Sequence, residues 1–430
     1  MSQGPSLIFD KSSLESLNLD EAVLLDNFYT STITPLFFVE CLADLEKKIS
    51  SKSTPEQLVG SLADRTPDAQ SSPNMHHTRI LSAELSRQFD LTTVHHRPAI
   101  DAGELVQLGD QKGIVFRRSK EAEALARWAE RHFLEVERNI AKEWRRSLTR
   151  INFNAMVTHV MRHLGPWRKP KTIEDARQLA DTMIENLDAE CLLRFGIDVL
   201  GLSEATDWVL NDWTERRRPP LREYVPYFVF MLTINIFFCL VLRTQLLSKV
   251  KESHTVDLAY LYYLPFCSVF TSKDNFHAQV VPLFLAPDQS FVNGIDLKED
   301  LKQLNGLYSA LPEDILKTGL SNFAHRPPED TTYLTTRLWD KYLPDWRANL
   351  HKGSKDPISP EEEKKLVDRI NRHFESPELQ RHDERDIDKL QYAIVERRIY
   401  PKKGKWLRFS EDQIKRALEH EQEKAKEKAG

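Results

Sequence analysis

Apolar and polar positions near the start of the chain alternate between short strand-like runs and helical patterns. Residues 6–9 form a short apolar run that ends at Asp10, and residues 33–38 form a second β-leaning run that leads directly into a helical segment. Between the two runs, Asn18 is followed three residues later by Glu21, which is the spacing of a capping box at the start of a helix. The pattern therefore predicts strand, helix, strand and helix in that order.

The middle of the chain is patterned as helix. Residues 50–74 are rich in Ser, Thr, Pro and Asp, which favours a loop or linker. Helical periodicity resumes at about residue 121 and continues with interruptions to about residue 247.

Strand and helix patterns alternate again after residue 250. They predict a helix over 256–264, strands over 266–270 and 280–285, and a helix from Asp296. Strands that alternate with helices form mostly parallel sheets covered on both faces. We therefore predict an α/β core whose two halves are residues 1–50 and 249–326, with a linker and helical insertion over 51–248 and a charged helical extension over 327–430.

Composition narrows the class of protein. The chain has 430 residues, of which 40% are hydrophobic and 29% are charged, as in soluble globular proteins. The formal net charge of −5 excludes a basic DNA coat protein. Four widely spaced cysteines exclude a zinc ribbon and a disulfide framework, and the N-terminus lacks the pattern of a signal peptide. We therefore expect a cytoplasmic protein.

One apolar run is long enough to span a membrane. Residues 225–242 contain no charged side chain. The alternative is a helix that is buried on all sides within a large domain. We favour the buried helix, because Thr233 and Asn235 interrupt the run and basic residues flank both of its ends, which gives no inside–outside bias.

Four acidic residues lie where an α/β fold places its chemistry. Asp10 ends the first strand, Glu40 begins the helix after the second, Asp257 opens a later helix and Asp274 follows another strand. Ligands of open α/β sheets bind beyond the carboxyl ends of the strands, so these acids can converge there. Converging carboxylates repel one another, and Mg²⁺ or Mn²⁺ would relieve that repulsion. The ordinary alternative is that each acid stabilises a helix N-terminus.

The same segments resemble a known superfamily. LIFDKSSL, ITPLFFVECLADL, VDLAYLYYLPFCSVFTSKDNF and VVPLFL are similar to the successive motifs of the PIN-like nucleases. The resemblance covers about residues 1–50 and 250–310. It implies a three-layer fold around a mostly parallel sheet, interrupted here by the large helical insertion, and a metal-dependent nuclease acting on RNA, as in members that resemble bacterial toxins.

The resemblance also assigns roles to residues. It implies that Asp10 is the central metal ligand and that Glu40, Asp257 and Asp274 complete the cluster, some of them through metal-bound water. Two departures stand out: the insertion is far longer than in a compact PIN domain, and the aromatic residue after Asp274 comes one position early. Asp44 shares a helical face with Glu40 and is an alternative ligand.

Neighbouring polar residues have two interpretations each. Thr271 or Ser272 can orient a carboxylate or contact a phosphate, or simply cap a turn. Lys11 and Lys273 can contact the substrate phosphate or face solvent.

Other patterns are weaker. The pairs His76-His77 and His95-His96 lack the supporting ligands of a metal site, and chance explains them better. Basic residues cluster with tryptophan, which suits single-stranded nucleic acid but is more often a core Trp beside extended Arg side chains. These clusters are Trp144-Arg145-Arg146, Trp167-Arg168-Lys169, Trp213 with Arg216, Arg217 and Arg218, and Trp406 with Lys402, Lys403 and Lys405.

We therefore expect a Mg²⁺- or Mn²⁺-dependent endoribonuclease, toxin-like, defence-like or RNA-processing, in which the insertion gates access or selects the substrate. Nucleic acid is the expected partner, and a regulatory protein partner stays open. The rival hypothesis is a PIN-like interaction module that binds nucleic acid or protein without cutting.

Overall fold

The structure is a computed structural model. It describes residues 4–43, 54–100, 104–108, 111–116, 118–134, 136–137, 139, 169–247, 254–348 and 392–419.

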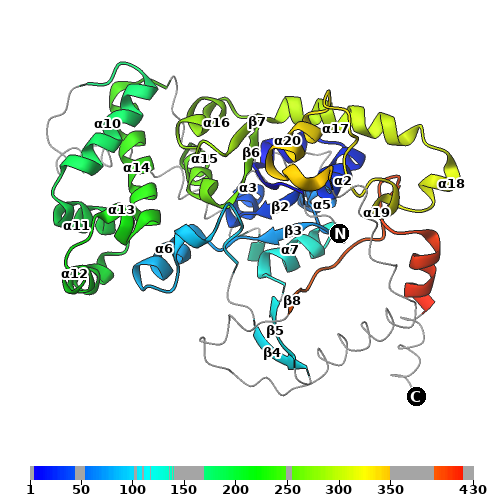
Figure 1. Ribbon diagram of the computed structural model, residues 1–430, viewed down its shortest axis with the longest axis horizontal. Coiled ribbons are helices and arrows are strands. Elements are labelled where there is room, and N and C mark those ends of the chain that lie inside the picture. Colours follow the sequence, from blue (N-terminus) through cyan, green and yellow to red (C-terminus); the bar gives the residue numbers. More distant parts are fainter. Residues whose placement is uncertain are drawn as a thin grey trace.

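Five parallel strands form the central sheet (Figure 1). The strand order is β3-β2-β1-β6-β7, and every neighbouring pair is parallel. The strands are β1 (Ser6–Phe9), β2 (Thr30–Ile33), β3 (Ser71–Pro73), β6 (Val269–Ser272) and β7 (Ser290–Asn293). Strands about 260 residues apart in the sequence, β1 and β6, therefore lie side by side, which confirms the predicted parallel α/β sheet.

Apolar cores cover both faces of the sheet, because side chains alternate along each strand. In β1, Leu7 and Phe9 belong to one core, and Ile8 belongs to the other. The first core packs helices α1 (Lys11–Ser16), α2 (Leu19–Phe28), α3 (Pro35–Ala43), α5 (Pro55–Arg65), α7 (Lys120–Ala129), α17 (Gly294–Ser309) and α20 (Leu334–Tyr342). The second core packs α6 (His77–Leu85), α15 (His254–Tyr260), the 3₁₀ turn η3 (Leu261–Phe266), α16 (Asn275–Val280) and the 3₁₀ turn η4 (Val281–Leu283).

A group of helices stands at one side of the sheet and shares the second core (Figure 1). It consists of α10 (Ile173–Asn186), α11 (Ala189–Val199), α12 (Thr206–Glu215), α13 (Leu221–Tyr224) and α14 (Pro226–Thr244). By length and composition α14 could cross a membrane, but 72% of its most apolar stretch is buried inside the protein. The predicted buried helix over 225–242 is therefore found at this position.

The remaining elements are shorter. A three-stranded sheet has the order β4-β5-β8 and a two-stranded sheet pairs β9 with β10. The bounds are β4 (Glu104–Leu108), β5 (Gln111–Phe116), β8 (Tyr392–Val395), β9 (Lys402–Lys403), β10 (Trp406–Leu407), α18 (Glu313–Leu316), α19 (Leu320–Phe323), and 3₁₀ turns η1 (Leu91–Thr93), η2 (Ser203–Ala205) and η5 (Pro344–Trp346).

Several predictions are wrong. The second strand is β2, and most of the run predicted as a strand over 33–38 lies in α3, so Glu40 is in the second half of that helix and not at its start. The segments predicted as helical also contain strands: β4 and β5 lie within 51–248, and β8, β9 and β10 lie within 327–430.

The linker predicted over 50–74 contains α5 and β3, so the third strand of the sheet lies beyond the boundary drawn at residue 50. The strand predicted over 280–285 is the end of α16 and η4, and the fifth strand is β7. Residues 280–285 resemble a strand because Val280, Val281 and Phe284 are buried in the second core, and a buried 3₁₀ turn is as apolar as a buried strand.

Candidate active site

The candidate site lies where the direction of the sheet reverses. From β1 the chain moves outward to β2, whereas from β6 it moves to β7 on the opposite side. The helices that make these two connections lie in different cores, α2 in the first and α16 in the second. Such a reversal leaves a crevice beyond the carboxyl ends of the two central strands. Asp10 directly follows β1, and Ser272 ends β6 at that same edge.

Asp10 is buried and its carboxylate is held by several donors. Its Oδ1 accepts the Ser13 amide at 2.9 Å, so the side chain caps α1. Its Oδ2 accepts the hydroxyl groups of Ser12 and Ser272, each at 2.7 Å. Burial alone would raise the pKa of Asp10, but hydrogen bonding and the charge of His277 bring it below its usual value.

His277 is fully buried beneath this carboxylate. Its Nδ1 lies 3.5 Å from Asp10 Oδ2 and 2.8 Å from Ser272 Oγ, and its Nε2 donates to the backbone carbonyl of Asp257 at 2.9 Å. Burial opposes the imidazolium, but the hydrogen bond and charge of Asp10 outweigh it and raise the pKa of His277 to about 9. The structure thus places His277 beside Asp10, where the carboxylate favours the protonated form of the imidazole.

Glu40 lies on α3 and faces the other acids. Its Oε2 accepts the hydroxyl of Tyr260 at 2.8 Å and the amide of Lys11 at 3.4 Å. Burial, together with the negative charges of Asp10 and Asp257, raises the pKa of Glu40 to about 8. The charges of Asp10 and Asp257 therefore act on Glu40 at one end of the sheet.

Asp257 and Asp274 occupy helix N-termini. Asp257 lies in the first turn of α15. Asp274 caps α16, where its Oδ1 accepts the Phe276 amide at 2.6 Å, and its own amide donates to Ser272 Oγ at 2.9 Å. Ser272 therefore connects Asp274 to Asp10, whereas the carboxylate of Asp274 serves its own helix.

The carboxylate oxygens of these acids are the kind of ligand that a hard divalent cation prefers. In this arrangement, however, they do not form a complete coordination shell. Among the residues that the structure describes, no three His, Cys, Asp or Glu side chains are grouped to hold a metal ion. Asp10 Oδ1 accepts only the Ser13 amide within this part of the chain, which leaves a lone pair for a ligand bond. Mg²⁺ commonly binds through one or two carboxylates and several waters, so a single direct ligand with water-linked acids is compatible with it.

Of the neighbouring residues, Ser272 and Lys273 each fit one of their two predicted interpretations, whereas the prediction that Lys11 faces solvent is wrong and Thr271 shows neither a carboxylate contact nor a turn cap within the described part of the chain. Ser272 orients a carboxylate, as one interpretation proposed. Thr271 is fully buried, and its hydroxyl has no hydrogen-bond partner among the described residues. Lys11 is buried and pairs with Glu15 at 3.6 Å, whereas Lys273 is exposed. The alternative ligand Asp44 lies outside the described residues.

Two residues of the site were missed in the sequence, His277 and Tyr260. Each stands three positions after a predicted acid, His277 after Asp274 and Tyr260 after Asp257. Residues three apart on a helix share a face, so this spacing is the signal that could have found both.

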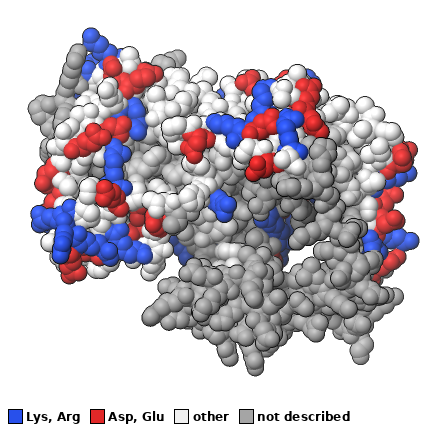
Figure 2. Space-filling model, in the orientation of Figure 1, with Lys and Arg blue, Asp and Glu red and all other residues white. Residues whose placement is uncertain are grey.

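The other sequence candidates have structural roles where they are described. His77 is held by the Tyr263 hydroxyl, and His96 pairs with Asp288. Trp213 and Trp406 are buried, which favours the core interpretation of their clusters. On the face in Figure 2, basic and acidic side chains are interleaved over the helices at the left rather than separated. Trp144, Arg145, Arg146, Trp167 and Arg168 lie outside the described residues.

The chain matches no protein-family model, and no curated protein or solved structure is significantly similar to it.

Proposed function

We propose that this protein is a Mg²⁺- or Mn²⁺-dependent endoribonuclease with a PIN-like core. One observation carries the proposal: at the reversal point of a parallel sheet, Glu40 accepts the backbone amide next to Asp10, and His277 contacts both the Asp10 carboxylate and the Asp257 carbonyl. Burial, together with the charges of Asp10 and Asp257, raises the pKa of Glu40, and acids with raised pKa values are common at functional sites. RNA as the substrate, and a cytoplasmic location, rest on the sequence resemblance and composition.

The residues have distinct roles in this proposal. Asp10 would hold the cation directly through Oδ1, and Glu40, Asp257 and Asp274 would hold it through water. When bound, the cation would activate a water and stabilise the entering and leaving oxygens of the phosphodiester. Ser12, Ser13 and Ser272 keep the Asp10 carboxylate in one orientation. Lys273 is exposed next to the site and would meet a substrate phosphate.

Cleavage of RNA tests the proposal. Purified full-length protein is incubated with mixed single-stranded and structured RNA in Mg²⁺ or Mn²⁺, and compared with Asp10→Asn and Asp257→Asn. Asp288→Asn is the matched control, because Asp288 precedes β7 at the opposite edge of the sheet and its side chain is 70% exposed. We expect the wild type and the control to cut, and both site variants to fold without cutting. Cutting by folded Asp10→Asn would overturn the assignment.

The second candidate function is binding without cleavage. The observation that favours it is that the Asp10 carboxylate already has side-chain partners, His277 Nδ1 at 3.5 Å and the hydroxyl groups of Ser12 and Ser272 at 2.7 Å. A wild type that binds RNA or a protein but neither cuts with any divalent cation nor binds Mn²⁺ in calorimetry would support this function instead.

A further inference from the structure

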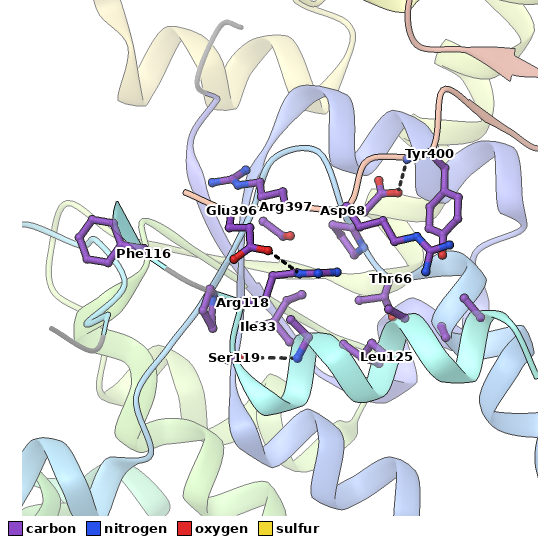
Figure 3. Close-up of a pocket in the computed structure, with 18 of the residues that line it drawn as sticks. Ile33, Thr66, Asp68, Phe116, Arg118, Ser119, Leu125, Glu396, Arg397 and Tyr400 are labelled. Atoms are coloured by element: carbon purple, nitrogen blue, oxygen red, sulfur yellow. Dashed lines mark hydrogen bonds and ion pairs between the residues drawn. The ribbon is translucent and has the colours of Figure 1, made fainter. Parts of the chain in front are cut away.

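A cavity lies away from the candidate active site, beside the edge strand β3. Its volume is about 110 Å³. One wall is α7, which carries Leu125, and the opposite wall is the segment from Glu396 to Tyr400 (Figure 3). A single water needs only about 10–15 Å³ on this measure, so the cavity can take a small organic molecule.

Most of the lining is apolar, and it comes from elements distant in sequence. The lining residues without a polar side-chain group are Ile33, Ala63, Pro67, Pro73, Ile100, Phe116, Ala122, Leu125, Ala126 and Ala129. Mostly apolar pockets with a few convergent polar groups are typical of small-molecule sites. The body of a ligand in this cavity would therefore be apolar.

Cationic groups outnumber anionic ones in the lining. The cationic residues are Arg118, Arg397, Arg398 and Lys403, and the anionic residues are Asp68 and Glu396. Most of these cations have a carboxylate partner: Arg118 pairs with Glu396 at 3.3 Å, Arg398 with Glu130 at 2.5 Å and Lys403 with Asp68 at 3.8 Å.

Arg397 differs from the other three cations. Its Nη1 donates to the Ala69 carbonyl at 2.6 Å, and no carboxylate of the described residues pairs with it. The side chain is half-buried, and burial lowers the pKa of its guanidinium. The negative charge of Asp26 acts on this guanidinium without forming an ion pair with it, so a bound anion would offset the remaining cost of withdrawing the cation from water.

We propose that this cavity binds a small amphipathic anion, an apolar chain or ring with one carboxylate or phosphate, and that Arg397 binds the anionic group. The guanidinium fork matches both groups, since each presents two oxygens in the required geometry. None of the acids of the candidate active site lines this cavity, so the proposal stands independently of nuclease activity.

Calorimetric titration of the full chain with hexanoate, hexyl phosphate and 1-hexanol tests the proposal. We expect one or both anions to bind at least ten times more tightly than the alcohol, because only the anions engage Arg397. The comparison of the two anions identifies the headgroup. If neither anion binds, or if hexanol binds as tightly as they do, the proposal is wrong.

Three variants locate the binding. Arg397→Gln removes the charge and is expected to weaken anion binding at least tenfold. Ala126→Phe fills the cavity and should abolish binding of the chain while leaving Arg397 in place. Arg337→Gln is the matched control, because Arg337 also donates to backbone carbonyls but lies elsewhere on the surface. Thermal unfolding checks that each variant is folded, and if Arg397→Gln unfolds, Ala126→Phe alone decides. Anion binding unchanged in folded Arg397→Gln or in Ala126→Phe would overturn the assignment.

Discussion

Ser272 is the residue on which the candidate active site depends most. Its Oγ donates to Asp10, accepts the Asp274 amide and lies within hydrogen-bonding distance of His277. We predict that Ser272→Ala lowers RNA cleavage by about 10- to 100-fold, because groups that orient a ligand carboxylate typically have effects of that size. Initial rates of cleavage at saturating Mn²⁺ measure the change.

Thr271 offers a matched control for that experiment. It is the preceding residue of β6, is equally buried, and carries a hydroxyl with no partner among the described residues. Thr271→Val keeps the shape and should leave cleavage unchanged. An equal loss of activity in both variants would mean that the strand, rather than the Ser272 hydroxyl, had been disturbed.

Glu84 predicts a dependence of stability on pH. Both of its carboxylate oxygens accept amides at the start of α14, from Tyr227 and Phe228, each at 2.7 Å. Burial nevertheless raises the pKa of Glu84 to about 7. The unfolded chain then releases this proton near pH 4.5, whereas the folded protein keeps it to about pH 7, so folding loses stability as pH rises through that window.

Urea denaturation of wild type and Glu84→Gln between pH 4.5 and 8 measures this contribution. The unfolding free energy of the wild type, relative to the variant, should fall with rising pH by up to about 1.4 kcal/mol per pH unit and level off above pH 7. Because all other titratable groups are the same in both proteins, the difference between wild type and Glu84→Gln reports the titration of Glu84 alone. A difference that stays constant with pH would contradict the prediction.

At this scale the sequence predicts the acids but not the groups that hold them. Asp10 and Glu40 could be found because each follows a short strand-like run. The partner of Asp10, Ser272, is 262 positions away, and only the pairing of β1 with β6 brings the two together. No local sequence pattern links Asp10 to Ser272. The three-residue spacing from Asp274 to His277, in contrast, is a local signal that could have identified His277.

Arg408 forms ion pairs that connect the C-terminal hairpin β9–β10, helix α2 and the segment before β3, and we call this set of contacts the clasp. Arg408 follows β10, is buried, and pairs with Asp26 of α2 at 2.7 Å and with Asp68. The Asp26 carboxylate also accepts the amides of Asp68, Ala69 and Gln70, which lead into β3. The clasp therefore fastens the C-terminal hairpin to the edge of the central sheet.

We predict that Arg408→Met lowers the unfolding free energy by about 3–5 kcal/mol, because it leaves the buried Asp26 without its cation and leaves Asp68 with only Lys403, 3.8 Å away. Burial already raises the pKa of Asp68 to about 6, so little further repulsion can be accommodated. Arg347→Met is the control, since Arg347 pairs with Asp340 near the surface and its loss should cost clearly less than the loss of Arg408. Chemical denaturation measures both, and equal losses would show that Arg408 contributes no more than a surface pair.

Helices and strands could be predicted from the sequence where a local motif marks their start. The capping box of Asn18 and Glu21 is present at the start of α2, as predicted. The edge strand β3 has the sequence Ser-Ser-Pro, which carries no apolar pattern. It is a strand because its backbone pairs with β2, and the sequence of the segment gives no sign of that pairing. The helix α5 carries a second capping box at Thr54 and Gln57, which the Ser- and Pro-rich composition of the segment concealed.

On the scale of the whole molecule, the sheet is closed by contacts between distant parts of the chain. β1 pairs with β6 across the full helical insertion, and the second core extends from the sheet into the α10–α14 group without a break. The described helices α10 to α14 of the insertion are thus part of the core, although the sequence alone predicts a separate helical segment.

The centre of α14 tests this integration. Phe237 is fully buried and packs edge-to-face on Phe284 with ring centroids 5.2 Å apart. Because the helix belongs to the core, we predict that Phe237→Ala lowers the unfolding free energy by about 3–5 kcal/mol. Phe230, on the same helix, is only partly buried, so Phe230→Ala should cost clearly less.

We also expect the full chain to stay in the supernatant after ultracentrifugation of a cell lysate. A chain that sediments with membranes, and whose stability responds equally to both substitutions, would instead indicate that α14 meets lipid in the cell and that the second core is completed by a bilayer.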